Sequence, residues 1–97
     1  MKLVALYKQP SDPEAFDRAY FDTHIPLIKK LPGLQKTVVT RFTRSIMGDA
    51  YYLMAEMHFA DEGALKAAMK SAEMAAAGEN LDGFAKGMYS LAFASEE

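Results

Sequence analysis

Apolar and polar residues alternate with two different periods along this chain, and the two periods predict four strands and two helices. Strands are expected where short β-prone runs end in turn residues, at residues 2–8, 34–42, 51–59 and 88–93. Helices are expected where apolar residues recur every three or four positions, from Asp12 to Leu31 and from Asp61 to Gly78. Residues 79–86 are predicted to form a connector that includes a turn around Leu81 to Phe84.

The first predicted helix has a defined start, an interruption and a defined end. Asp12 can accept hydrogen bonds from the free N–H groups of the first turn, and Pro13 has no donor to leave unpaired. Pro26 falls inside the apolar pattern, where its missing N–H and its ring disturb a regular turn, so we expect a kink or a helix in two pieces. Gly33, which tolerates left-handed backbone, closes the segment.

The predicted order of elements is β-α-β-β-α-β, in one domain that spans residues 1–97. The turn at Met47-Gly48-Asp49 joins the second and third strands into a hairpin. Two right-handed βαβ halves joined by a hairpin give a ferredoxin-like α+β fold, with a four-stranded antiparallel sheet and both helices on one face.

The second face of this sheet is predicted to need a partner. Along strand 51–59, one side carries apolar residues at every odd position, and the other side carries Tyr52 and Met54 beside Glu56 and His58. Burying one large apolar side chain contributes roughly 1.5–3 kcal/mol, so about five of them left in water forgo on the order of 10 kcal/mol. We therefore expect two identical sheets to pair face to face around a two-fold axis, as a homodimer. The alternative is a monomer with a modestly apolar exposed face.

Composition and charge exclude several classes of partner. The formal net charge is −2 with acids and bases interspersed, which does not favour binding to nucleic acid. The chain has no cysteine, which excludes disulfides and thiolate sites and fits a reducing compartment, so we expect a cytoplasmic location. The apolar run Leu3 to Leu6 is far too short for a signal sequence or a membrane span, which needs about 20 residues.

Five segments of the chain form a recognisable set: residues 4–8, the Tyr20 to Leu27 segment with His24-Ile-Pro26, residues 31–34, residues 51–59, and the Asn80 to Ala85 segment. Together these segments, which cover nearly the whole chain, resemble the EthD family, whose members are small dimeric α+β-barrel proteins named for a component of an ethyl tert-butyl ether degradation cluster. The resemblance implies a dimeric barrel, related to a superfamily that handles aromatic polyketides, lactones and haem. It does not imply one reaction, because a fold alone does not decide function.

The candidate catalytic residues are His24, Tyr20 and Tyr7. His24 follows Tyr20 by four positions, which places both on one helical face. Imidazole is the side chain whose unperturbed pKa suits proton transfer near neutral pH. Tyr20 and Tyr7 can donate phenolic hydrogen bonds that orient a ligand. The alternative is structural: His24 would hold a free carbonyl at the Pro26 kink, and the tyrosines would only fill the core.

We expect ligand-binding residues in an apolar pocket between the sheet and the helices, with aromatic side chains and an adaptable methionine. These residues are Phe16, Tyr52, Met54, His58 and Phe84. His24, His58 and Glu56 contain the donor types of a facial metal site, but no close ligand spacing supports one, so no metal is expected.

Three functions remain open. The first is a cofactor-free enzyme in which His24 acts as general acid or base on a small hydrophobic oxygenated compound, in degradation or polyketide-type metabolism, since no nucleotide, flavin or metal motif is present. Isomerisation, cyclisation, dehydration and oxygen-dependent oxidation are compatible reactions. The second is a binding protein for such a small hydrophobic molecule, and the third is haem binding through His24, which only the superfamily resemblance suggests.

Overall fold

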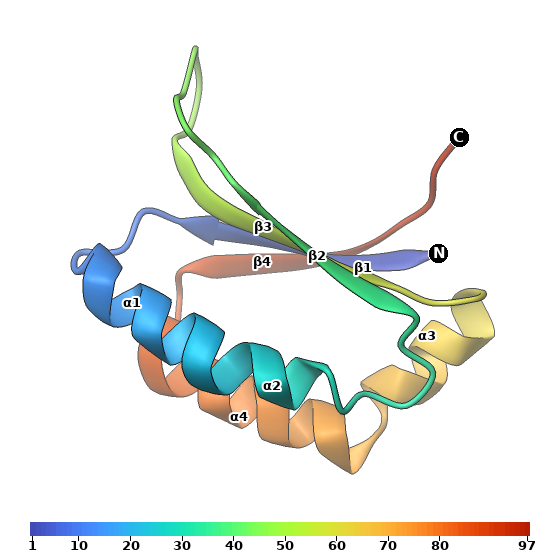
Figure 1. Cartoon of the computed structure of the whole chain (residues 1–97). Helices are drawn as coiled ribbons and strands as arrows, with labels where there is room; N and C mark the ends of the chain where they lie inside the picture. Colours follow the sequence, from blue (N-terminus) through green and yellow to red (C-terminus); the bar gives the residue numbers. More distant parts are fainter.

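The computed structural model describes all of residues 1–97 and consists of one four-stranded sheet with helices packed against one of its faces (Figure 1). The strands are β1 (Lys2–Lys8), β2 (Lys36–Arg41), β3 (Tyr51–His58) and β4 (Tyr89–Ala94). Their order is β2-β3-β1-β4, and every neighbouring pair is antiparallel. The predicted α+β, ferredoxin-like arrangement is therefore confirmed.

The helical segments are α1 (Pro13–Ala19), the π-helix η1 (Tyr20–His24), α2 (Ile25–Ile28), α3 (Glu62–Met69) and α4 (Ala72–Ala85). Both predicted helix starts are confirmed by their caps. The Asp12 carboxylate accepts a hydrogen bond from the N–H of Ala15 at 3.1 Å, and the Asp61 carboxylate accepts one from the N–H of Ala64 at 2.8 Å. These bonds satisfy donors that the first turn of a helix leaves free.

The first helix consists of two α-helical pieces joined by the wider turn η1. The N–H of Ile25 donates to the carbonyl of Tyr20, five residues back, which defines the π-type turn. Pro26 then lies in the first turn of α2, where a missing N–H costs little. The expected two-piece helix is confirmed, and the π turn is the joint that the sequence did not predict.

The connector predicted for residues 79–86 is wrong, because α4 continues through Gly78 to Ala85. A helical interior glycine costs about 1 kcal/mol relative to alanine, but the stripe of Ala77, Leu81 and Ala85 is buried against the core and outweighs that cost. The helix break lies earlier, where the Ser71 hydroxyl accepts from the N–H of Met74 at 3.1 Å and starts α4 as a new helix.

The core lies between the helices and the inward rows of the sheet. Leu3, Ala5 and Tyr7 of β1 are buried, as are the odd-numbered residues of β3 from Leu53 onward, so the predicted alternation is confirmed there. Tyr52 departs from it. The register of β1 with β3 steps from Tyr7–Leu53 to Lys8–Tyr51, so Tyr52 is the extra residue of a β-bulge and packs toward α1.

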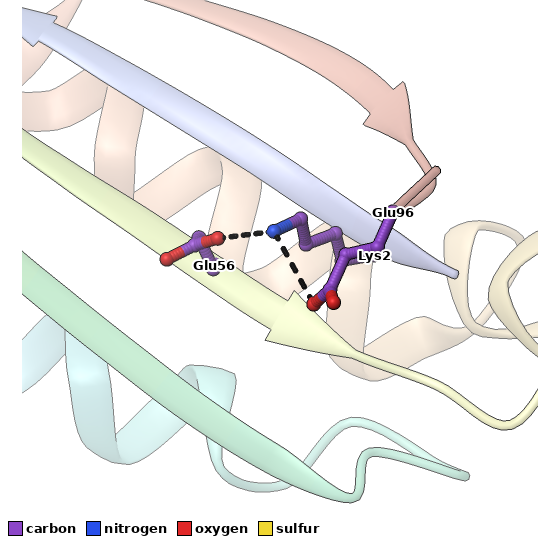
Figure 2. A network of polar contacts seen from close by, with 3 residues as sticks. All are labelled: Lys2, Glu56 and Glu96. Atoms are coloured by element: carbon purple, nitrogen blue, oxygen red, sulfur yellow. Dashed lines mark hydrogen bonds and ion pairs between the residues drawn. The ribbon is translucent and has the colours of Figure 1, made fainter.

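The opposite face of the sheet is not covered by any helix (Figure 1). Its middle carries the half-buried side chains of Val4, Leu6 and Met54. At one end, the Lys2 ammonium contacts the Glu56 carboxylate at 2.5 Å and Glu96 at 4.0 Å, and these three side chains lie on the face away from the helices (Figure 2). This face is therefore apolar in its centre and charged at one end.

The edge strand β4 is only partly covered on the helix side. Leu91 pairs with Ala5 and Phe93 pairs with Leu3, so both belong to inward rows, yet they are 47% and 43% exposed. The β2–β3 hairpin rises away from the helices beyond the open face (Figure 1), and Ile46 and Met47 near its tip are each 86% exposed. No helix of the chain combines the length and the apolar character needed to cross a bilayer.

Candidate functional site: an apolar cavity between sheet and helices

A cavity of about 50 Å³ lies between the helix side of the sheet and the segments η1, α2 and α4. It is lined by 16 residues, 13 of them hydrophobic, and all four strands contribute. The volume is well below the roughly 300–1,000 Å³ of sites that hold drug-sized ligands. The site therefore suits a slender molecule with few polar groups.

Small side chains create this hollow. Ala5 of β1 and Ala55 of β3 lie directly opposite each other in the centre of the sheet floor. Ala77 and Gly78 of α4 line the other side, and no atom lies within 4 Å of where a Cβ on Gly78 would stand. The sequence contains a signal for this cavity, namely small residues at inward positions of strands whose neighbouring inward residues are large.

Apart from the tyrosines, His24 is the only buried side chain with polar atoms, at 3% exposure, and it lines the cavity. Its Nδ1 lies 3.1 Å from Oδ1 of Asn80 on α4. An amide oxygen can only accept, so Nδ1 carries the proton and donates it, and Nε2 is the unprotonated ring nitrogen. Nε2 makes no hydrogen bond within the protein, which leaves a basic atom available in the site.

The protonation state of His24 follows from its surroundings. Burial lowers the pKa of the imidazole below its usual value, because the charged form loses hydration, and the hydrogen bond to Asn80 opposes part of that shift. His24 is therefore neutral near pH 7, in the state in which it can accept a proton.

Tyr20 and Tyr7 bring two phenols to the same cavity. Their rings are 5.2 Å apart edge to face, and the ring of Tyr20 lies 5.5 Å from that of His24. Burial is the main cause that raises the pKa of Tyr20 to about 12, and burial likewise raises the pKa of Tyr7. Both phenols remain protonated at neutral pH and can act as hydrogen-bond donors.

Two buried side-chain hydroxyls, those of Tyr20 and Thr37, make no hydrogen bond of good geometry, and both residues line this cavity. The Tyr7 hydroxyl is near enough to that of Tyr20 to oppose part of the rise in its pKa, but the two phenols do not meet in hydrogen-bond geometry. A buried hydroxyl left unpaired costs about 1–3 kcal/mol, so native structures keep few of them. The two hydroxyls without a partner therefore lie in one apolar hollow. Thr37 was not among the sequence candidates, since nothing in a β-strand pattern marks an inward threonine as unpaired.

The structure brings together the three candidate catalytic residues Tyr7, Tyr20 and His24, and separates the expected ligand-binding set from the cavity. Phe16 and Phe84 surround the catalytic candidates, with ring centres 5.6 Å from Tyr20 and 6.1 Å from His24 respectively, but neither lines the cavity.

The other three members lie further away. The Tyr52 hydroxyl donates to Asp17 at 2.7 Å, and Arg41 donates to the same carboxylate at 3.1 Å, in a cluster that ties the hairpin to α1. Met54 and His58 project to the open face, because side chains alternate along β3 and its inward-facing residues have odd numbers. The five side chains do not form one lining, and the cavity is lined instead by residues such as Ala55, Met57 and Leu81.

The three residues considered for a metal site are also separated. His58 and Glu56 lie on the open face of the sheet, whereas His24 lies beneath the opposite face. No group of three histidine or acidic side chains is close enough to hold a metal ion.

The fold and cavity together define a class of protein: a ferredoxin-like α+β chain with a small apolar cavity that contains a neutral histidine and protonated tyrosines. The model of the EthD domain matches residues 8–87. The chain belongs to the EthD family. A solved structure of an ethyl tert-butyl ether D (EthD) family protein from Bacillus halodurans is 44% identical, with a TM-score of 0.93 and coverage of 99% of this chain and 97% of that one.

More distant solved structures share the fold. A dimeric ferredoxin-like protein of unknown function from Jannaschia sp. has a TM-score of 0.69 at 17% identity, with 98% of each chain covered. SnoaB from Streptomyces nogalater, described as a cofactor-independent oxygenase, has a TM-score of 0.61 at 16% identity, with 99% of this chain and 93% of that chain covered. At these identities the likeness shows a common fold.

Proposed function

We propose that the cavity binds a small, uncharged carbonyl compound and that His24 acts on it as a general base, without a cofactor. The observation that carries this proposal is the pairing of an unprotonated, unpaired Nε2 of His24 with an unpaired hydroxyl on the adjacent Tyr20, both in an apolar hollow. A base beside a hydrogen-bond donor is the arrangement needed to remove a proton next to a carbonyl group.

The proposed step balances without a further reactant. A C–H bond next to the carbonyl breaks, Nε2 of His24 gains the proton, and the electron pair moves to the carbonyl oxygen. The Tyr20 hydroxyl donates a hydrogen bond to that oxygen, where negative charge develops, and such donors are most effective in a water-poor cavity. When the proton on Nε2 exchanges with solvent before a proton returns to the same carbon, the result is hydrogen exchange. In an unsaturated carbonyl compound, return of the proton to the far carbon of the dienolate gives isomerisation.

The EthD family and the fold shared with SnoaB support this choice of chemistry. SnoaB is described as an oxygenase that works without a cofactor, so this scaffold can accommodate a reaction that relies on side chains. The support is general, since one fold can host unrelated reactions.

A binding protein is the second candidate, and the His24–Asn80 hydrogen bond favours it. That bond connects η1 to α4 across the core, so it stabilises the packing of the two helices whether or not the imidazole takes part in chemistry. Haem binding is not proposed, because His24 is the one feature of the cavity that would favour it, and its Nδ1 already pairs with Asn80.

Exchange of carbonyl-adjacent hydrogens for deuterium tests the proposal with a simple probe. Hexan-2-one in D₂O is followed by ¹H NMR with the wild type and with His24→Gln, which keeps a side-chain donor near Asn80 but lacks the base. We expect catalysed exchange by the wild type and background exchange by the variant. His58→Ala, on the open face, is the matched control and should exchange at the wild-type rate.

The outcomes separate the two candidates. Binding of hexan-2-one without catalysed exchange in the wild type identifies a binding protein and overturns the general-base proposal. Equal exchange by wild type and His24→Gln also overturns it.

We further propose that two copies of the chain pair through their open sheet faces. The apolar centre formed by Val4, Leu6 and Met54 has no cover within the chain, and an uncovered patch on a soluble protein commonly marks an interface. The exposed hairpin tip extends past the same face, in a position to contact the partner. A protein of the same fold from Jannaschia sp. is described as dimeric, which supports pairing as such.

Sedimentation velocity at micromolar concentration tests the pairing. We expect the wild type to sediment as a dimer and Leu6→Lys to sediment as a monomer, because each interface would then bury two unpaired ammonium groups. Ala76→Lys, at an exposed position of α4, is the control and should remain dimeric. A monomeric wild type would overturn the proposal.

A further inference from the structure

We infer that the ligand of the cavity is a slender, uncharged molecule with two separated oxygen functions, one for the Tyr20 hydroxyl and one for the Thr37 hydroxyl. This inference deepens the proposed function and rests on it for the identity of the site. It adds the shape, charge and number of polar groups of the ligand.

The two unpaired hydroxyls belong to side chains that enter the cavity from different rows of the sheet. Thr37 lies opposite Met57, which lies opposite Leu3, at the start of β1. Tyr20 packs against Tyr7, four residues further along β1 than Leu3, and the backbones of Leu3 and Tyr7 are about 13 Å apart at the usual rise of a strand. From this separation of the two rows we infer one ligand oxygen for each hydroxyl.

The region between the two hydroxyls is apolar and narrow. Its floor is the Ala5–Ala55 pair, and Ala77 and Gly78 lie on the helix side. A water molecule there would find few of the two to four polar partners that hold a buried water in place. An unbranched hydrocarbon segment fits this middle section better than solvent does.

The ligand is inferred to be uncharged because no lysine or arginine lines the cavity. A carboxylate or phosphate placed there would lose its hydration without gaining a cation. Ketone, aldehyde, ether, ester and alcohol oxygens can all pair with a hydroxyl without that loss. Tyr20 requires an acceptor for its proton, which a carbonyl oxygen supplies, while Thr37 can donate or accept.

Two ketones with the same carbon chain test the inference. Hexane-2,5-dione offers two oxygens and hexan-2-one offers one, and their affinities are measured by NMR titration of the wild type. We expect the dione to bind about tenfold more tightly, the factor that corresponds to about 1.4 kcal/mol. Thr37→Val should remove this difference and leave the affinity for hexan-2-one unchanged. Tyr20→Phe should weaken the binding of both ketones.

Thermal unfolding of the free protein adds a readout that separates a ligand contact from a structural role. Replacing an unpaired buried hydroxyl by a methyl group of similar shape should leave the unfolding temperature of Thr37→Val unchanged or higher. Thr40→Val, on the exposed side of the same strand, is the matched control and should affect neither ketone.

The inference is overturned if wild type binds both ketones equally, if the dione does not bind, or if Thr37→Val weakens both ketones alike. It is also overturned if Thr37→Val lowers the unfolding temperature while the dione keeps its advantage. Its failure is distinguishable from failure of the proposed function, which is judged by the effect of His24→Gln on deuterium exchange.

Discussion

Replacing Gly78 by alanine, which adds a methyl group beside the cavity, should have two opposite effects. It should stabilise the folded chain and weaken the binding of a ligand. Gly78 lies in the middle of α4, lines the cavity, and has no atom within 4 Å of the position of a new Cβ. Gly83 lies in the same helix with equally open surroundings, but its side is exposed to solvent. The pair therefore separates the effect of alanine on a helix from its effect on the cavity.

Both substitutions should stabilise the folded chain. Replacing a helical glycine whose conformation alanine can adopt contributes about 0.4–1 kcal/mol, largely by restricting the unfolded chain. In a chain of this length, about 1 kcal/mol corresponds to an increase of about 4–8 °C in the unfolding temperature. Only Gly78→Ala should weaken ligand binding, because its methyl group would occupy space next to the cavity that the ligand needs. We expect a loss of about tenfold in affinity, which corresponds to about 1.4 kcal/mol.

The assay combines calorimetric unfolding of the free proteins with NMR titration of hexan-2-one. The expected result is a similar rise in unfolding temperature for both variants and a loss of affinity for Gly78→Ala alone. If Gly78→Ala binds hexan-2-one as tightly as Gly83→Ala does, the ligand does not occupy the cavity next to α4, and the reasoning about the small residues is refuted.

Two further predictions concern His24 and Tyr52. Burial lowers the pKa of His24 in the folded chain below its ordinary value of 6.5, so as the pH falls the unfolded chain takes up the proton first. The free energy of unfolding should therefore be greatest above pH 6.5 and decline as the pH falls below it. Urea titrations at several pH values check this, and a decline of the same size in His24→Asn would contradict the assignment. Tyr52→Phe removes the hydrogen bond to Asp17 and should lower the free energy of unfolding by about 1 kcal/mol. It should not change the affinity for hexan-2-one, and a change would show that Tyr52 reaches the cavity after all.

Most of the fold could be predicted because several local signals agree with one another. Asp12-Pro13 and Asp61 mark helix starts, Gly33 and Gly48 take the positive φ angles that end a helix and turn a hairpin, and the strand periods match the buried rows. The extent of α4 could not be predicted in this way. Gly78 favours a helix end locally, and only the packing of Leu81 and Ala85 against the sheet shows that the helix continues.

The site could be predicted less completely. His24 and Tyr20 were identifiable because their spacing and chemistry are both local properties of one helix. Asn80 and Thr37 were not, since their importance depends on which side chains approach them from other elements. The β-bulge shows the same limit: one unpaired residue moves Tyr52 from the open face to the helix side, although the sequence of β3 alternates without interruption.

The wide turn at Tyr20–His24 contains one more residue than a regular helical turn needs. Both end residues of this turn are ones for which we propose a role in the reaction. The flanking pieces α1 and α2 pack against the core through Phe16 and Ile28, so they do not depend on that surplus residue. A chain that lacks the exposed Asp22 should therefore still assemble its sheet and helices. In that shortened chain, Tyr20 and His24 would be three positions apart instead of four. The loss of one amino acid would then remove the proposed reactivity and leave folding intact.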